Sequence, residues 1–208
     1  MMKRLALNYQ NPKGVLGNLT LHKMNHHHKP LMDWTFQKLA LRFDSKALDI
    51  GCGGGKMIKR LAKLLPYGKV YGLDLSPLSV RHSKWENLRN VRRHTVKIVE
   101  GDVCKLPFKS NNFDLITAIE TIYYWQEPER GFQEVLRVLK PGGKFVIACE
   151  LSENGKTLPK KWSHIGEEVS LYLPSAKDLK QKLLDLGFLC VQSKMHSKYG
   201  WLYVIAEK

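Results

Sequence analysis

A glycine-rich loop lies where a ligand could approach the main chain. The loop, Gly51-Cys52-Gly53-Gly54-Gly55, separates an apolar run at 47–50 from a helical pattern at 56–65. Glycines between a strand and a helix let the backbone turn sharply and leave room for a ligand. Lys56 stands where a dinucleotide fingerprint needs its last glycine, and no Gly-Lys-Ser/Thr sequence follows as in a phosphate-binding loop. The loop therefore disfavours NAD, FAD and a P-loop nucleotide.

Two carboxylates follow the next two expected strands. Asp74 ends the second strand and could accept hydrogen bonds from both hydroxyls of a ribose. Asp102 follows the third strand and is placed to accept from an adenine amino group. Helix capping or turn formation is the other role open to both side chains. Because both fall at the same sheet edge as the glycines, we expect them to bind a nucleoside that carries no phosphate.

Strand and helix patterns alternate from residue 46 onward. Their short connections predict a parallel sheet with helices on both faces. The last two apolar segments, 188–195 and 201–206, are too close for anything but an antiparallel hairpin. We expect a three-layer α/β sandwich whose seven-stranded sheet has five parallel strands and a C-terminal antiparallel hairpin. The expected strands are 47–50, 70–73, 96–99, 113–119 and 144–149 plus the hairpin, and the expected helices are 56–65, 76–88, 129–139 and 175–186.

The first part of the chain differs from this alternating region. Residues 1–45 are basic and contain several glycines and prolines, with a helical apolar pattern only from Met32 to Phe43. We expect an N-terminal arm at 1–45 that ends in one helix, followed by a single domain at 46–208.

Composition limits the class of protein and its location. No apolar stretch approaches the length of a membrane span, and the N-terminus lacks the sustained apolar core of a secretory signal. The four cysteines are far apart in the sequence, so we expect free thiols in a reducing cytosol rather than disulfides or a zinc cluster. These features predict a cytoplasmic protein without a membrane partner.

The net charge of +15 raises the question of nucleic-acid binding. The densest basic cluster falls on the second expected helix and its exit loop, which in a parallel sheet lies opposite the ligand edge. A nucleic acid bound there could not easily be positioned for chemistry, so nucleic acid is not the favoured partner. The cluster consists of Arg81, Lys84, Arg89, Arg92, Arg93 and Lys97.

Five ordered segments together resemble one enzyme family. The segments at 48–55, 72–76, 101–108, 113–116 and 134–143 closely resemble class I S-adenosylmethionine-dependent methyltransferases of the small, single-domain type, which have a Rossmann-like fold. The resemblance implies S-adenosylmethionine as cofactor and S-adenosylhomocysteine as product. It implies that the methionine part of the cofactor is surrounded by Asp49, Gly51, Cys52 and Gly53. It implies that Asp74 holds the ribose, that Leu75 lies against the adenine, and that Asp102 and Val103 hold the adenine edge. Residues Ala118 to Glu120 are then expected to border the reacting methyl group.

The loop after the fourth strand is expected to adjoin the methyl group. Its aromatic residues Tyr123, Tyr124 and Trp125 could line a pocket for a flat or cationic acceptor, or they could pack under the following helix. Glu120, Tyr123 and His196 are possible bases, and Glu120 is expected to contact the acceptor or the cofactor amino group. The Asn/Asp-Pro-Pro-Tyr/Phe tetrapeptide of many nucleic-acid amino methyltransferases is absent.

The N-terminal arm also resembles that of a subgroup of these enzymes. The shared residues are Met24-Asn25, a nearby histidine and Trp34, all of which precede the first strand. In the subgroup, such arms fold over the cofactor as a lid. We therefore expect residues 15–35 to form a lid and Trp34 to lie near the substrate. The run His26-His27-His28 has no carboxylate or cysteine partner near it in sequence. The run could bind a metal ion, but we expect it to be a solvated loop and expect no metal site.

These features favour a methyltransferase that acts on a small-molecule acceptor by in-line displacement at the methyl group. An RNA or protein methyltransferase is the first alternative. A protein that binds S-adenosylmethionine without turning it over is the second.

Overall fold

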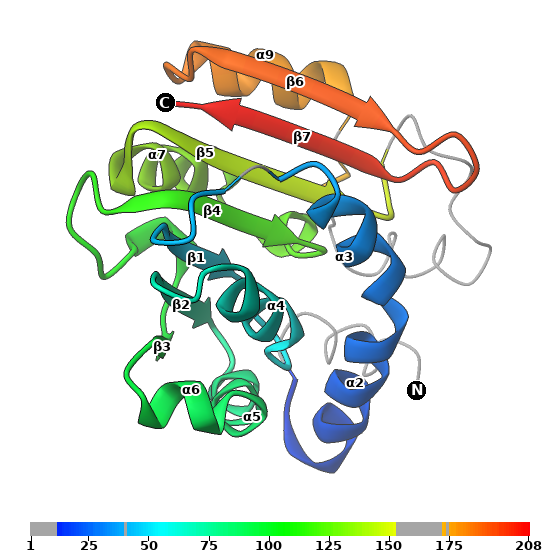
Figure 1. Cartoon of the computed structure of the whole chain (residues 1–208). Coiled ribbons are helices and arrows are strands. Elements are labelled where there is room, and N and C mark those ends of the chain that lie inside the picture. Colours follow the sequence, from blue (N-terminus) through cyan, green and yellow to red (C-terminus); the bar gives the residue numbers. More distant parts are fainter. Residues whose placement is uncertain (1–11, 40, 153–171, 174) are drawn as a thin grey trace.

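A seven-stranded mixed sheet forms the centre of the protein (Figure 1). The computed structural model describes residues 12–39, 41–152, 172–173 and 175–208. The strand order is β3-β2-β1-β4-β5-β7-β6, with β1 to β5 parallel and β7 antiparallel to both β5 and β6. This confirms the predicted fold class. The strands are β1 Lys46–Ile50, β2 Lys69–Asp74, β3 Val96–Glu100, β4 Phe113–Ile119, β5 Leu139–Cys149, β6 Cys190–Met195 and β7 Leu202–Glu207.

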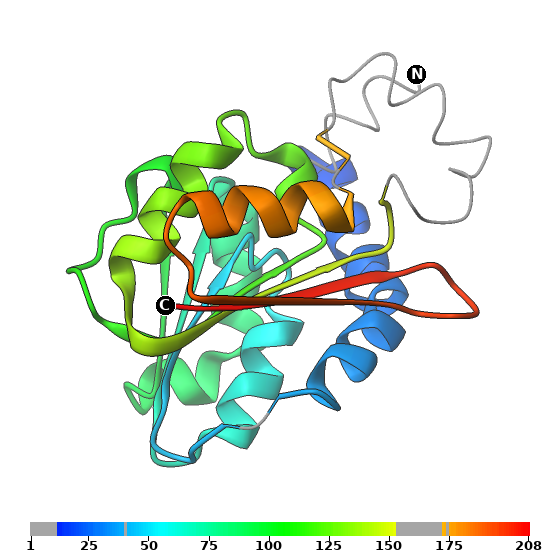
Figure 2. The same cartoon turned by 90° about the horizontal axis from the view of Figure 1, so that it is seen from above.

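Helices cover both faces of the sheet, as Figure 2 shows with the sheet seen nearly edge-on. On one face lie α4 (Lys56–Leu64) and α5 (Pro77–Glu86), followed by the short α6 (Leu88–Arg92). On the other face lie α7 (Pro128–Val138) and α9 (Ala176–Asp185). Two short 3-10 helices, η1 (Val103–Lys105) and η2 (Ile122–Tyr124), follow β3 and β4. Among the described residues, no helix is long and apolar enough to cross a membrane.

Alternation along the strands divides the core into two layers. Leu48 and Ile50 belong to the cluster under α7 and α9, whereas Ala47 belongs to the cluster under α4 and α5. Asp49, which alternates with Leu48 and Ile50, is therefore directed to the α4 side. The strand order reverses between β1 and β4, which is where ligands bind in open α/β sheets.

Among the residues of the N-terminal arm that the structure describes there are two helices, so the expectation of one helix was wrong. They are α2 (Gly14–His27) and α3 (Lys29–Phe36), and α3 replaces the helix expected from Met32 to Phe43. The sequence pattern missed α2 because its apolar residues do not form one stripe: Thr20 and Leu21 are buried while Leu16 and Leu19 are exposed. The helix has no amphipathic pattern, but it packs against α5 and α3, and such tertiary contacts stabilise helices.

Two boundaries in the main domain also differ from expectation. The strand expected at 144–149 begins earlier, at Leu139, and its pairing with β4 shifts register between Phe113 and Leu115. The helix expected at 76–88 ends at Glu86, because Asn87 interrupts it and donates its amide hydrogens to the carbonyl oxygens of Gly55 and Ser83.

Candidate active site

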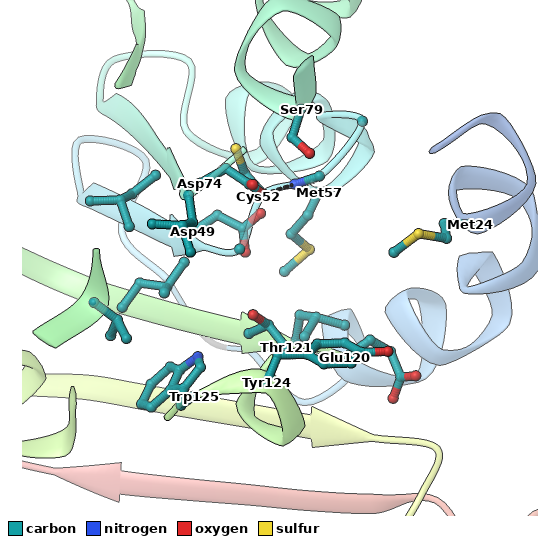
Figure 3. Close-up of a pocket in the computed structure, with 18 of the residues that line it drawn as sticks. Met24, Asp49, Cys52, Met57, Asp74, Ser79, Glu120, Thr121, Tyr124 and Trp125 are labelled. Carbon is teal, nitrogen blue, oxygen red and sulfur yellow. Dashed lines mark hydrogen bonds between the residues drawn. The ribbon is translucent and has the colours of Figure 1, made fainter. Parts of the chain in front are cut away.

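A cavity opens at the carboxyl ends of the parallel strands (Figure 3). The loops after β1, β2, β3 and β4 line it, and α2 and α3 cover one side. Asp49 and Asp74 lie on one wall, whereas Thr121, Tyr124 and Trp125 lie on the opposite wall. The sheet thus brings the predicted glycine loop and carboxylates together.

The glycine loop is held in a conformation that other residues rarely adopt. Gly51, Gly53 and Gly55 have φ angles of +68°, +49° and +82°, in the left-handed region that favours glycine. The amides of Gly51 and Cys52 both donate to the Leu73 carbonyl, at 2.8 and 3.1 Å. A Cβ on Gly51 would overlap the side chain of Thr121. The loop therefore depends on glycine for its conformation and for its approach to the loop after β4.

Asp74 connects the ends of β1 and β2. Its Oδ2 accepts from the Gly53 amide at 2.8 Å and its Oδ1 accepts from the Ser76 amide at 2.9 Å. Burial raises the pKa of this carboxyl, against the hydrogen bonds from Ser76 and Gly53 that lower it. Each carboxylate oxygen has about two lone pairs, so the carboxylate retains acceptor capacity toward the cavity.

Asp102 occupies the equivalent place after β3. Its Oδ1 accepts from the Cys104 amide at 2.9 Å and caps η1. Val103 is buried beside it, and Leu75, on the neighbouring loop, is half exposed and lines the cavity. Asp74 and Asp102 thus both carry the turn-forming hydrogen bonds that the sequence analysis treated as the alternative role, while both also line the cavity.

Asp49 is a buried carboxyl on the cavity wall. It is 2% exposed and accepts a hydrogen bond from Thr117 Oγ1 at 2.7 Å. Burial raises its pKa to about 7, the Thr117 hydrogen bond lowers it, and the charge of Asp74 raises it. Such a carboxyl favours a positively charged group bound next to it.

Glu120 lies immediately after β4 in a left-handed conformation, with φ +58°. Its Oε1 accepts from Tyr123 Oη and from the Glu150 amide, both at 2.5 Å. Burial raises the pKa of Glu120 to about 7, while the charge of His28 lowers it and that of Glu150 raises it. Glu120 is one of the residues that line the cavity. Its second oxygen, Oε2, lies close to His28.

The aromatic residues after β4 divide between the cavity and the core. Tyr124 and Trp125 line the cavity, but Trp125 is only 6% exposed and also packs against Phe132 of α7, which was the alternative role. Tyr123 is 3% exposed, does not line the cavity, and directs its hydroxyl to Glu120. It therefore orients Glu120 instead of facing an acceptor, and burial raises its pKa well above the usual tyrosine value.

Three other expected site residues lie outside the cavity lining. Ala118 is fully buried in the core, and its neighbour Ile119 takes the place at the cavity because successive strand residues face opposite sides. Trp34 packs against Trp201 and Tyr203 of the C-terminal hairpin instead of facing the cavity. His196 lies in the same aromatic group, 5.2 Å from Trp34 between ring centroids, and does not reach the cavity.

The N-terminal arm contributes cavity residues that sequence reasoning did not identify individually. Leu21, Met24, His28 and Met32 line the cavity from α2 and α3. His26 and His27 are exposed, as expected for a solvated segment, but the run is not a loop and His28 is partly buried. The run lies at the end of α2 and at its cap, and His28 Nδ1 lies 3.6 Å from Glu120 Oε2 and 3.4 Å from Glu150 Oε1.

Further lining residues come from positions without a recognisable pattern. Met57 projects from α4, Ser79 from α5, and Thr121 follows β4. These three residues are far apart in the sequence, and the fold brings them to the same cavity. The sequence predicted only the start of the helix that carries Ser79, from Ser76-Pro77.

Comparison with known proteins supports the interpretation of this site. Residues 48–147 match the family described as methyltransferase domain. The chain is 33% identical over 153 residues to 2-methyl-6-phytyl-1,4-hydroquinone methyltransferase of Arabidopsis thaliana, a match that covers 73% of this chain and 42% of that protein. It is 36% identical over 135 residues to demethylmenaquinone methyltransferase of Staphylococcus aureus, covering 64% of this chain and 53% of that protein. The chain thus spans about half the length of the curated relatives that it matches.

A solved structure shows the same fold. A methyltransferase from Aquifex aeolicus described as dependent on S-adenosylmethionine superposes with a TM-score of 0.72 at 24% identity, covering 90% of this chain and 96% of that chain. At this identity the likeness concerns the fold alone.

The fold and the site define a Rossmann-like α/β domain with a cavity at the switch point of its sheet, where such folds hold a nucleoside-containing ligand. The family match makes this more specific: the domain at 48–147 is a class I S-adenosylmethionine-dependent methyltransferase domain, and its cofactor is S-adenosylmethionine.

Proposed function

We propose that the protein transfers the methyl group of S-adenosylmethionine to a small-molecule acceptor held beside Tyr124 and Trp125. The observation that carries the proposal is the single continuous cavity that runs from the glycine loop to these two rings. When bound, the cofactor supplies a methyl group made electrophilic by its sulfonium. The protein then mainly orients the acceptor and excludes water.

The residues on the first wall fit the nucleoside half of the cofactor. The backbone of Gly51 and Gly53 leaves space that a side chain would fill, and Asp74 has remaining lone pairs for ribose hydroxyls. Asp102, with Val103 and Leu75, would hold the adenine. Asp49 would face the positively charged methionine part, since its buried carboxyl favours a cation.

The arm would close the site as a lid. Leu21, Met24 and Met32 place apolar side chains on the cavity from α2 and α3, which would exclude water from the methyl group. Apolar contacts of this kind suit a flexible cover, since methionine adapts to irregular surfaces.

Aromatic hydroxylated compounds are the acceptor class that we favour. The two curated relatives are named for a hydroquinone and for demethylmenaquinone. The rings of Tyr124 and Trp125 would stack on a flat acceptor of this kind. The basic residues of α6 lie at the amino end of β3, opposite the cavity, so they support neither RNA nor a protein tail as the acceptor.

The test is an acceptor screen that measures S-adenosylhomocysteine. The full chain is incubated with S-adenosylmethionine and with separate panels of hydroquinones, catechols, small amines and total RNA. We expect turnover with a hydroxylated aromatic compound, and Trp125→Ala should raise the KM for it more than it raises the cofactor Kd. Turnover with RNA alone, weakened steeply by salt, would replace the proposal with the nucleic-acid alternative. Cofactor binding without any turnover would favour a non-catalytic binding protein.

A further inference from the structure

A histidine and two glutamates from three distant segments meet at the acceptor end of the cavity. His28 is the residue that separates α2 from α3, Glu120 follows β4 and Glu150 follows β5. One ligand atom from each lies within 4.8 Å of the other two. The three side chains are largely buried, with exposed fractions of 17%, 10% and 18%.

The distances in this cluster are longer than hydrogen bonds between charged groups. His28 Nδ1 lies 3.4 Å from Glu150 Oε1 and 3.6 Å from Glu120 Oε2. A protonated histidine bonded to a carboxylate would lie about 2.7–2.9 Å from it. Instead, Nδ1 is buried and has no hydrogen-bond partner among the described residues. Nδ1 thus lies within ion-pair distance of two carboxylates but forms a hydrogen bond to neither, and Glu150 Oε2 also lies 3.4 Å from His27 Nε2. A bound cation would give these groups a shared partner.

The two distances from His28 Nδ1 to the carboxylate oxygens match edges of a metal coordination polyhedron, and the third pair of ligand atoms lies within 4.8 Å. Zinc binds nitrogen and carboxylate oxygen at about 2.0–2.2 Å, so tetrahedral ligand atoms lie roughly 3.4 Å apart. One neutral imidazole and two carboxylates would also balance the charge of a divalent ion. We propose that His28, Glu120 and Glu150 bind a zinc ion, with its fourth position open to the cavity.

The surroundings orient the ligands in the way that metal sites require. Glu120 Oε1 is already held by Tyr123 Oη and the Glu150 amide, which leaves Oε2 for the ion. Tyr123 Oη in turn accepts from the Leu151 amide at 3.1 Å. Such outer hydrogen bonds fix a carboxylate ligand and tune the metal. Tyr123 thus acquires a positioning role that explains its burial.

The position of the ion defines what it would do. His28 and Glu120 line the cavity, so an open fourth position would face the acceptor. An oxygen atom of the acceptor, such as a phenolic hydroxyl, would complete the coordination and would release its proton to water more readily. This last point rests on the proposed function, whereas binding of the ion does not. The ion would also link the arm to the ends of β4 and β5.

The test measures zinc binding by the full chain after treatment with a chelator. Isothermal titration with Zn²⁺ should give one site per chain, and zinc should raise the Tm. His28→Gln and Glu150→Gln should each weaken binding by at least about tenfold. His22→Gln is the matched control, because His22 is exposed on the same helix and lies outside the cluster; it should bind zinc as the parent does.

Two results would overturn the inference. One is a parent chain that shows no zinc binding and no change in Tm. The other is unchanged zinc binding in both His28→Gln and Glu150→Gln, with native circular dichroism, which would place the ion on exposed histidines. Should His28→Gln fail to fold, Glu150→Gln decides the matter, since it preserves the size of the side chain. Zinc binding without turnover of any acceptor would refute the proposed function and leave this inference standing.

Discussion

The buried carboxyl of Asp49 should make the protein less stable as the pH rises. The cofactor-free protein keeps this group 2% exposed, with Thr117 as its hydrogen-bond donor. Its pKa is about 7 in the folded chain, against 3.8 as the ordinary value. Between these two pKa values the folded chain holds a proton that the unfolded chain has released. The free energy of unfolding therefore decreases as the pH rises through this window.

The size of the effect follows from the pKa difference. A shift of one unit corresponds to about 1.4 kcal/mol, so a shift of roughly three units corresponds to about 4 kcal/mol. The full contribution of the neutral carboxyl is present below the unfolded pKa and is lost above the folded pKa. Asp49→Asn removes the titration while it retains an oxygen that can accept from Thr117.

The assay is urea unfolding of the parent and Asp49→Asn at a series of pH values from 4 to 8, without cofactor. From pH 4 to pH 8, we expect the parent to lose about 4 kcal/mol more of its free energy of unfolding than Asp49→Asn loses. Contributions shared by both proteins cancel in the difference. Thr117→Val is a second control, because losing a hydrogen bond to the charged form should shift the window to higher pH. Parallel stability curves for the parent and Asp49→Asn would refute the reasoning.

Four further predictions concern the cofactor loop, the carboxylates and the arm. Gly51→Ala should abolish cofactor binding and lower the free energy of unfolding, because the new Cβ would overlap the Thr121 side chain. Gly142→Ala is the control: Gly142 has φ +73° and open space around the new Cβ, so the loss of stability should be only roughly 1–2 kcal/mol. Equal losses in chemical unfolding would show that the contact between Gly51 and Thr121 is unimportant. Asp74→Asn should weaken S-adenosylmethionine binding by about 10–100-fold in calorimetry, and it should also lower the Tm, because the new amide nitrogen cannot accept from both the Gly53 and Ser76 amides; unchanged affinity would remove its assignment to the ribose. Glu120→Gln should lower turnover or cofactor affinity, measured as S-adenosylhomocysteine formation and as Kd; full retention of both would dismiss Glu120 from the site. Deleting residues 15–35 should weaken cofactor binding, and an unaltered Kd in a folded deletion variant would reject the lid.

Local patterns were sufficient to predict most of the domain. Alternating strand and helix periods from residue 46 correctly indicated the five parallel strands, and the short 197–200 connection required the final antiparallel hairpin. Glycine positions were informative for the same reason: a positive φ at Gly51 or Gly53 is a local requirement that the residue type reveals. Asp74 was predictable because it ends a strand whose carboxyl end must lie at the ligand edge.

Position on a strand was harder to predict where one residue decides the facing side. Ala118 and Ile119 are adjacent, yet only Ile119 lines the cavity. The direction of each side chain was equally hard to predict in the loop after β4. Tyr123 and Tyr124 both belong to the 3-10 helix η2, whose successive side chains point in different directions, and only Tyr123 is buried in the core. No local pattern distinguishes these neighbours, since all of them are apolar or aromatic.

The sequence by itself determined the fold of the main domain and the cofactor edge, because periodicity, glycine conformation and strand order are encoded locally. The tertiary structure alone decided which residues of the arm and of the ends of β4 and β5 meet at the cavity. α2 has no amphipathic stripe, and its place over the cavity depends on contacts with α5 and α3. His28 has no partner near it in sequence, but folding brings Glu120 and Glu150 to it from the ends of β4 and β5. Contacts between such distant segments arise from packing, so the glycine loop could predict the methyl donor while the acceptor side emerged only in three dimensions.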